Sequence, residues 1–106
     1  SNGLSTPLLK NRKDMGEARV KIIVSGLVQG VYFRAATRQQ ARQLGIAGWV
    51  KNCRDGSVEV LAEGDSEKLE QLITWCRKGP AGAVVEEVKV EWRPFQGEFQ
   101  DFKIAH

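Results

Sequence analysis

The sequence predicts an α+β domain in which two helices cover one face of a single sheet. Four stretches show the two-residue alternation of apolar and polar side chains that is typical of strands, and two show the three- and four-residue spacing that is typical of helices. These stretches follow one another in the order βαββαβ. The chain of 106 residues, 42% hydrophobic and 27% charged, has the length and composition to bury one core.

The strands are recognised by apolar residues at every second position and by turn residues between them. In the first strand Val20, Ile22 and Val24 share one face. A hairpin signal at 54–56, which ends in glycine, separates the second strand from the third. The expected strands are Arg19–Ser25, Ile46–Cys53, Ser57–Glu63 and Glu87–Arg93, with a short edge strand within Phe99–Ile104.

Both helices have recognisable ends. The first is expected to begin at Phe33 and to end before Gly45, since glycine commonly takes the left-handed position after a helix. Asp65 or Ser66 can cap the second helix with a side-chain oxygen, and Gly79, followed by proline, ends it. Each helix carries its apolar residues on one stripe, which is typical of a helix that packs against a sheet.

Two helices that each recross the sheet favour a ferredoxin-like βαββαβ sandwich, with an antiparallel sheet, both helices on one face and a short C-terminal strand at an edge. Residues 19–106 are expected to form this domain. Residues 1–18 show no sustained period and mix Ser, Asn, Gly, Pro and charged residues, which predicts a flexible N-terminal leader.

Composition also indicates the compartment. No apolar run approaches the roughly 20 residues of a membrane span, and the N-terminus lacks the apolar segment of a signal peptide. We therefore expect a cytoplasmic protein with no membrane partner. Cys53 and Cys76 do not have the spacing of metal ligands. Free thiols are expected, and a disulfide between them stays open as an alternative.

The charged residues are unevenly distributed. The net charge is +3, but residues 19–55 carry seven cationic side chains and a single acidic one, whereas residues 56–106 carry six cationic and ten acidic ones. A field of this kind attracts small anions. The basic part of the chain contains the segment with the clearest features of an anion site.

That segment, residues 26–34, joins the first strand to the first helix through Gly26 and Gly30. Glycine permits a positive φ and close approach of the backbone to a ligand, and the N–H groups at the start of a helix lack partners within it. Anions bind at such junctions. Arg34 adds a planar guanidinium that suits phosphate or carboxylate. The segment therefore predicts a site for a small anion, with phosphate favoured.

Asn52, near the end of the second strand, is the other polar residue with a candidate role. Its carboxamide has donors and an acceptor without a charge, which suits holding a water molecule, but asparagine at such a place also commonly shapes a turn. By the two-residue period Asn52 and Trp49 lie on opposite faces. We therefore expect Asn52 on the exposed side of the sheet or turned out at the strand end.

Two blocks of sequence carry a resemblance to a known family. They are Gly26-x-Val28-Gln29-Gly30-Val31-x-Phe33-Arg34 and Leu44-Gly45-Ile46-x-Gly48-Trp49-Val50-x-Asn52, followed by Asp55-Gly56-x-Val58-Glu59. Blocks in this order and at this separation resemble the acylphosphatase family. The similarity extends over residues 19–104, nearly all of the chain apart from the leader.

The resemblance implies hydrolysis of an acyl phosphate to a carboxylate and inorganic phosphate. Arg34 and Asn52 would be the catalytic pair, with Asn52 positioning the attacking water. The phosphoryl group would be bound by Arg34 and by the backbone N–H groups of Gln29, Gly30, Val31, Tyr32 and Phe33. No metal, cofactor or nucleic-acid partner is implied, and a monomer is expected. The partners are the acyl phosphate and inorganic phosphate.

Such a reaction suits a site without a metal or a strong acid, because phosphoryl transfer depends mainly on positioning and charge stabilisation. The leaving carboxylate belongs to an acid with a pKa of about 4, so it departs without a proton. An alkoxide would need a proton donor or a metal, and the only histidine of the chain is the terminal His106.

Several residues have more than one possible role. Cys53 stands where many relatives of the family have a threonine that orients the asparagine or its water, and a thiol is a poorer hydrogen-bonding group. Tyr32 either borders the acyl group or is an exposed loop residue without a role. Arg38 and Arg42, one helical turn apart, either extend the anion site or face solvent.

Two alternatives to a free-standing enzyme also follow from the sequence. The fold serves in non-catalytic modules that bind nucleic acid or a regulatory anion, but the third strand is acidic and without stacking aromatics, and no Cys-x-x-Cys pair is present. A domain of a larger carbamoyl-transfer protein would require zinc-binding and catalytic domains beyond these 106 residues.

Most aromatic residues are expected in the core: Phe33, Trp49, Trp75, Trp92, Phe99 and Phe102.

Overall fold

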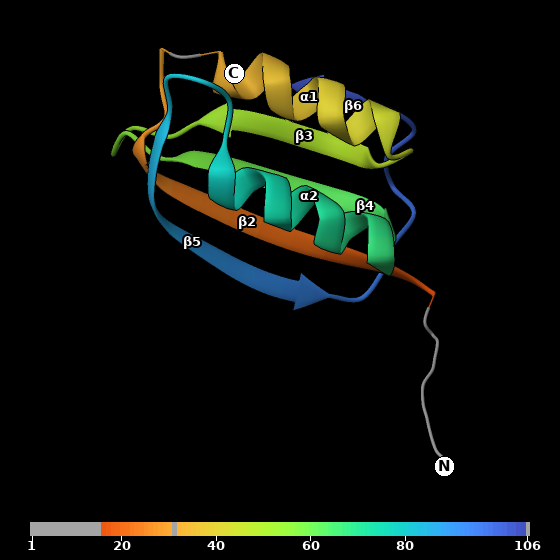
Figure 1. Ribbon diagram of the computed structural model, residues 1–106. Helices are drawn as coiled ribbons and strands as arrows, with labels where there is room; N and C mark the ends of the chain where they lie inside the picture. The colour runs from red at the N-terminus through yellow and green to blue at the C-terminus, as the bar shows by residue number, and fades with distance from the viewer. Residues whose placement is uncertain (1–15, 31, 106) are drawn as a thin grey trace.

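The computed structural model of the chain describes residues 16–30 and 32–105. Its elements are β2 (Glu17–Leu27), α1 (Phe33–Gln43), β3 (Ala47–Asn52), β4 (Val58–Asp65), α2 (Ser66–Lys78), β5 (Val84–Arg93) and β6 (Phe102–Ile104). Figure 1 shows both helices on one face of the sheet. The predicted ferredoxin-like βαββαβ order with a terminal strand is confirmed. Neither helix of this described part is long and apolar enough to cross a membrane.

The sheet has the strand order β5-β2-β4-β3-β6 and is mixed. β2 pairs antiparallel with β4 and β5, and β3 pairs antiparallel with β4. β6 pairs parallel with β3, so the prediction of a wholly antiparallel sheet is wrong at this edge. The reason is the direction of the chain. β5 runs opposite to β3 at the far edge, and residues 94–101 reverse the chain once while they carry it across the end of the sheet.

Two strands begin earlier than the sequence predicted. Glu17 and Ala18 already belong to β2, where they pair with Asp65 and Gly64 of β4. The rest of the expected leader, residues 1–15, lies outside the described residues. β5 likewise begins three residues before its predicted start and pairs there with the end of β2. The regular domain therefore includes the last two residues of the segment predicted to be a leader.

The core lies between the sheet and the helix layer. α1 packs on β3 and β6, and α2 packs on β2, β4 and β5 (Figure 1). The buried apolar residues of the strands follow the predicted alternation: Val20, Ile22, Val24, Val50, Val58, Val60, Ala62 and Phe102. The helices contribute Phe33, Ala41, Leu69, Leu72, Ile73 and Cys76. Both helices therefore bury the predicted stripe against the sheet.

Three aromatic residues expected in the core lie outside it. Trp92 stands on the edge strand β5 and is 46% exposed. Trp49 and Phe99 are half-buried on the uncovered face, where each ring contacts a cation. Lys51 Nζ lies 5.2 Å from the centroid of Trp49, and the Arg19 guanidinium carbon lies 5.3 Å from that of Phe99. Alternation alone does not show which face of a strand will be covered.

A buried ion pair on the uncovered face anchors the link between β5 and β6. Glu63 is 2% exposed, and Arg19 Nε lies 3.1 Å from its Oε2. The backbone N–H groups of Gln96 and Gly97 donate to the same oxygen at 2.7 and 3.3 Å, and that of Glu98 donates to Oε1 at 3.2 Å. Arg19 also pairs with the Glu98 carboxylate. The segment that leads into β6 is thus tied to β2 and β4.

The same contacts decide the charge of Glu63. Burial disfavours its carboxylate, but the Gln96 N–H, the Arg19 guanidinium and the Glu98 N–H together outweigh burial and hold the pKa of Glu63 below its ordinary value. Glu63 shares a strand face with Glu59, and the strand itself offers neither carboxylate a cationic partner. The partner is Arg19, 44 positions away on the neighbouring strand.

Asp65, rather than Ser66, caps α2, because its Oδ1 accepts a hydrogen bond from the Glu67 N–H at 2.9 Å. Replacing Asp65 by alanine is expected to lower the free energy of unfolding by about 1 kcal/mol, measured by urea denaturation. Ser66→Ala is the control at the neighbouring position, with an expected change within about 0.5 kcal/mol. A larger loss for Ser66→Ala than for Asp65→Ala would show that the cap is assigned to the wrong residue.

Candidate active site

The junction between β2 and α1 begins with a β-bulge. The register between β2 and β5 shifts between Ser25 and Gly26. Gly26 has a φ of 126°, and a Cβ at this position would lie 2.2 Å from the carbonyl oxygen of Val84. Only glycine therefore permits this approach of the two backbones. A bulge at the end of a strand redirects the chain, and here it leads away from the sheet toward the first turn of α1.

The start of α1 is suited to an anion. Gly30 and Tyr32 both have positive φ, 78° and 60°. Tyr32 is the N-cap, its side chain makes no capping hydrogen bond, and the first turn contains no acidic residue. The N–H groups of a first helical turn have no partner within the helix and carry partial positive charge. They are therefore available here to bind an anion.

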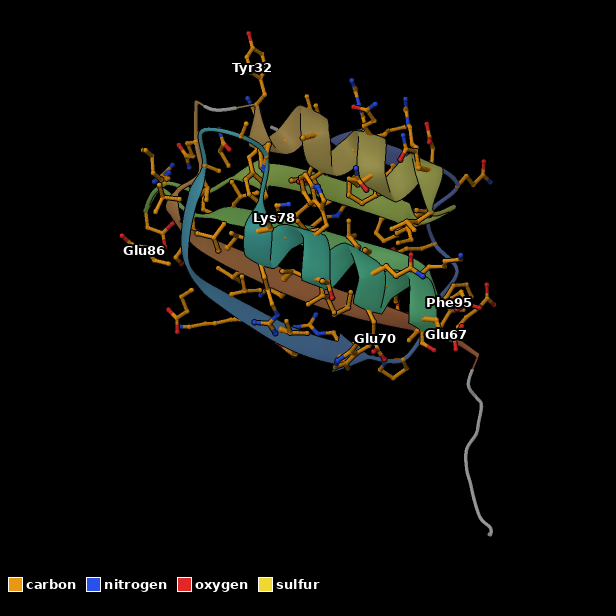
Figure 2. The ribbon with its side chains drawn as sticks, in the orientation of Figure 1. Tyr32, Glu67, Glu70, Lys78, Glu86 and Phe95 are labelled. Carbon is orange, nitrogen blue, oxygen red and sulfur yellow. The ribbon has the colours of Figure 1, made fainter. Side chains whose placement is uncertain are left out.

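Tyr32 is held in a conformation that is unfavourable for a residue other than glycine, at a cost of about 1–2 kcal/mol. Its side chain is 85% exposed and stands away from the ribbon above the start of α1 (Figure 2). Such backbone strain is often found where a loop is shaped for a ligand. Of the two roles left open for the Tyr32 ring, its exposure favours that of an exposed loop residue, whereas the positive φ of Tyr32 shapes the loop through the backbone.

Arg34 and Asn52 line one cavity of about 610 Å³. Arg34 is half-buried in the first turn of α1, and Asn52 is exposed at the end of β3. Of the five loop residues expected to hold phosphate, Gly30, Tyr32 and Phe33 line this cavity. Gln29 does not line it, and Val31 lies outside the described residues. The remaining lining residues are Val28, Ala35, Arg38, Arg42, Lys103 and Ile104.

Asn52 reaches the cavity because it lies on the helix-covered face of the sheet. It pairs with Val58, which is buried beneath the helices, and it shares its face with Val50. Of the two positions expected for Asn52, the exposed side of the sheet is wrong, since Trp49 occupies that side, and the residue lies instead exposed at the strand end. Trp49 and Val50 are adjacent apolar residues, so the sequence left the phase of this strand ambiguous. Asn52 follows the last core residue and faces the start of α1.

Gln29 connects the two halves of the site. Its Nε2 donates to the carbonyl oxygens of Cys53 at 2.7 Å and Ser57 at 3.0 Å. Cys53 follows Asn52 in the chain, so this side chain ties the junction before α1 to the hairpin after β3. The sequence singled out Gln29 for its backbone N–H and missed the role of its carboxamide. A carboxamide within the loop was the only signal that could have suggested it.

Replacing Gln29 by glutamate is expected to lower the free energy of unfolding by about 1–3 kcal/mol. The carboxylate keeps the shape of the side chain but cannot donate to the two carbonyl oxygens. Urea denaturation measures the change, with Gln71→Glu on the exposed surface of α2 as the matched control. An equal, small effect of the two substitutions would contradict the tie between loop and hairpin.

The two cysteines are free thiols in the structure. Burial raises the pKa of Cys76 to about 12, so this thiol is a neutral core residue. The Cys53 thiol donates to Glu59 Oε1 at 3.8 Å, and Glu59 lies 3.8 Å from Lys21 Nζ on the uncovered face of the sheet. This contact points Cys53 toward the face opposite Asn52. It offers no support for a role of Cys53 in orienting the asparagine.

The charged residues that line the cavity are all cationic: Arg34, Arg38, Arg42 and Lys103. Within the described part of the chain, no three His, Cys, Asp or Glu side chains are grouped as metal ligands. Cationic groups with helix N–H donors favour a small anion over a metal ion. The fold and the cavity therefore define a two-layer α+β domain with an anion site where a strand passes into a helix.

Comparison with known proteins identifies the family. The acylphosphatase family model matches residues 20–104. An acylphosphatase from Pelotomaculum thermopropionicum is 54% identical over 91 residues, which cover 86% of this chain and 99% of that protein. The structure of an acylphosphatase from Coxiella burnetii aligns with a TM-score of 0.81 at 36% identity, covering 89% of this chain and 98% of that one. An acylphosphatase from Bacillus subtilis gives 0.81 at 35% identity, covering 84% and 99%.

The chain belongs to the acylphosphatase family and is a hydrolase. The family resemblance inferred from the two sequence blocks is confirmed. The matched range spans both blocks and both helices, and Arg34 and Asn52 lie within it. It favours the enzyme over the non-catalytic binding module that the fold alone also allowed.

Proposed function

We propose that this chain hydrolyses its acyl phosphate by in-line attack of water on phosphorus, with Arg34 and Asn52 as the catalytic residues and without a metal. One observation carries the proposal. The two side chains come from the start of α1 and the end of β3, 18 positions apart in the sequence, and line the same cavity. The partners are a small acyl phosphate and inorganic phosphate, and the protein acts as a monomer.

The phosphoryl group binds at the start of α1. Backbone N–H groups from Gln29 to Phe33 surround its oxygens, and the Arg34 guanidinium pairs with two of them. Positive φ at Gly30 and Tyr32 and the uncapped first turn support this assignment, because both leave N–H groups free to converge on an anion. Neutralising the phosphoryl oxygens lowers the repulsion that an attacking water meets.

Asn52 holds the attacking water opposite the leaving group. Its carboxamide accepts a hydrogen bond from the water through oxygen and donates one to a phosphoryl oxygen through nitrogen. This arrangement holds the water and the phosphoryl group in position for reaction, and such positioning is a main requirement of phosphoryl transfer. The exposed position of Asn52 at the strand end supports the assignment, since water reaches it directly.

No general acid or strong base is needed in this mechanism. The bond between phosphorus and the acyl oxygen breaks, and the carboxylate leaves with the electron pair because its acid has a pKa of about 4. The new bond joins the water oxygen to phosphorus. The water proton passes to a phosphoryl oxygen of the substrate. The products are a carboxylate and inorganic phosphate, and no covalent intermediate with the protein forms.

Hydrolysis of acetyl phosphate in the presence of a chelator tests the proposal. We expect the wild type to hydrolyse acetyl phosphate at the same rate with and without the chelator, and inorganic phosphate to inhibit competitively. Arg34→Gln should lose both turnover, by at least about 100-fold, and phosphate binding. Arg77→Gln, which removes an exposed cation from α2, is the control. Activity that disappears with the chelator and returns with a divalent metal would contradict the proposal, as would normal phosphate binding by Arg34→Gln.

A further inference from the structure

The cavity continues along α1 beyond the proposed phosphate site. Arg38 and Arg42 follow Arg34 at intervals of four residues, so the three guanidinium groups lie along one side of the helix. β6, which packs beside α1, contributes Lys103 to the same cavity. Phosphate needs only the first of these cations. The others extend the positive charge of the cavity away from the reacting phosphorus.

The three additional cations differ in their partners. Arg42 donates to Asp101 Oδ2 at 3.0 Å, so its charge is largely matched. Arg38 and Lys103 form no ion pair with the residues that the structure describes. Arg38 is half-buried, which reduces the screening of its charge by water. Apart from Arg34, the cavity cations without an ion-pair partner among the described residues are therefore Arg38 and Lys103, and the charge of Lys103 also acts on the Asp101 carboxylate.

The spacing on the helix sets the size of the group that could reach these residues. Four residues of α-helix span about 6 Å. A ligand with its phosphoryl group beside Arg34 would bring a second anion beside Arg38 if a spacer of two or three carbon atoms separated the two. A short neutral acyl group, such as acetyl, would leave Arg38 and Lys103 without a contact.

We propose that the acyl half of the substrate carries a second anionic group, a carboxylate or a phosphate, which Arg38 and Lys103 bind. The inference rests on the proposed function, because it takes the phosphoryl site at Arg34 as its reference point. It answers the question that the sequence left open for Arg38: this side chain extends the anion site. The substrate class is then an acyl phosphate with an anionic tail.

Binding of non-hydrolysable phosphonates tests this inference without turnover. Isothermal titration calorimetry compares butylphosphonate, which has an apolar tail, with 4-phosphonobutyrate, which has a carboxylate tail, and with propane-1,3-bisphosphonate. We expect the wild type to bind at least one of the two anionic-tailed probes about tenfold more tightly than butylphosphonate. Which of the two is preferred shows whether the tail is a carboxylate or a phosphate. The preference should weaken at high salt.

Matched variants assign the preference to these residues. Arg38→Gln and Lys103→Gln should each reduce several-fold the ratio between the affinity for the preferred anionic-tailed probe and the affinity for butylphosphonate. Arg77→Gln and Lys68→Gln, which remove the same charges from exposed positions on α2, should preserve this ratio. Equal binding of all three phosphonates by the wild type would overturn the inference, and so would an undiminished ratio in both cavity variants.

These outcomes are distinguishable from failure of the proposed function. If acetyl phosphate is hydrolysed and butylphosphonate binds but no preference for an anionic tail appears, only the inference about the tail is wrong. If neither inorganic phosphate nor any phosphonate binds, the phosphate site itself is wrong and both proposals are overturned.

Discussion

Replacing Asn52 by alanine is expected to lower kcat for acetyl phosphate by at least about 100-fold, equivalent to roughly 3 kcal/mol of transition-state stabilisation, while inorganic phosphate still binds. The asymmetry follows from the two roles. Arg34 and the loop hold the phosphoryl group in the substrate, the transition state and the product. Asn52 contributes only when a water molecule is present to attack. Steady-state kinetics and phosphate titration of the same variant measure the two effects.

The alternative role of Asn52, shaping the turn after β3, predicts a different result. A turn residue would lower the free energy of unfolding when replaced and would affect kcat little. Urea denaturation of Asn52→Ala therefore accompanies the kinetics, with Gln71→Ala on α2 as the control for loss of an exposed carboxamide. Near-wild-type turnover in Asn52→Ala would remove Asn52 from the mechanism, whatever its stability.

Replacing Glu63 by alanine is expected to lower the free energy of unfolding by about 3–5 kcal/mol. The substitution leaves Arg19, itself buried, without its partner on β4 and deprives three backbone N–H groups of their acceptor. The link into β6 loses its attachment to the sheet at the same time. Equilibrium denaturation in urea at neutral pH measures the loss, and Glu87→Ala on the exposed surface of β5 is expected to change stability by less than about 0.5 kcal/mol.

The pH dependence of stability provides a second test of Glu63. Its pKa is lowered in the folded state, so its contribution to stability is fully present above the pKa of an unfolded glutamate, about 4.3, and is lost as the pH falls through the lower folded value. The difference in unfolding free energy between the wild type and Glu63→Gln should therefore shrink in acid below about pH 4. A difference that stays constant across this range would contradict the claim that Glu63 is ionised in the folded state and stabilised there by Arg19 and the backbone N–H groups.

The sequence predicted those parts of the structure that depend on local pattern. Alternation located the strands, the spacing of apolar residues located the helices, and Asp65 was one of two proposed caps. Two glycines before a helix and the following Arg34 indicated an anion site. These features depend on residues close together in the chain, and their physical causes act locally. The cavity that joins Arg34 to Asn52 was expected from the family resemblance rather than from such patterns.

The features that the sequence did not predict depend on contacts between distant segments. The phase of β3 was ambiguous because Trp49 and Val50 are adjacent, and only pairing with β4 places Asn52 beneath the helix layer. The parallel pairing of β6 follows from the path of residues 94–101, whose anchor is Glu63. Similarly, the bridge from Gln29 to the hairpin joins positions 24 and 28 residues apart. Each requires knowledge of which strands are neighbours.

Hydrolysis in water enriched in oxygen-18 tests the central claim most directly. If Asn52 positions the attacking water for in-line displacement at phosphorus, each inorganic phosphate formed in a single turnover takes one oxygen from water. The labelled fraction of the phosphate then equals the enrichment of the water, and the carboxylate contains no label. Mass spectrometry of both products, with chelator present, distinguishes the two positions of attack. Label in the carboxylate would show that water attacks the acyl carbon, and the assignment of the site around phosphorus would then be wrong.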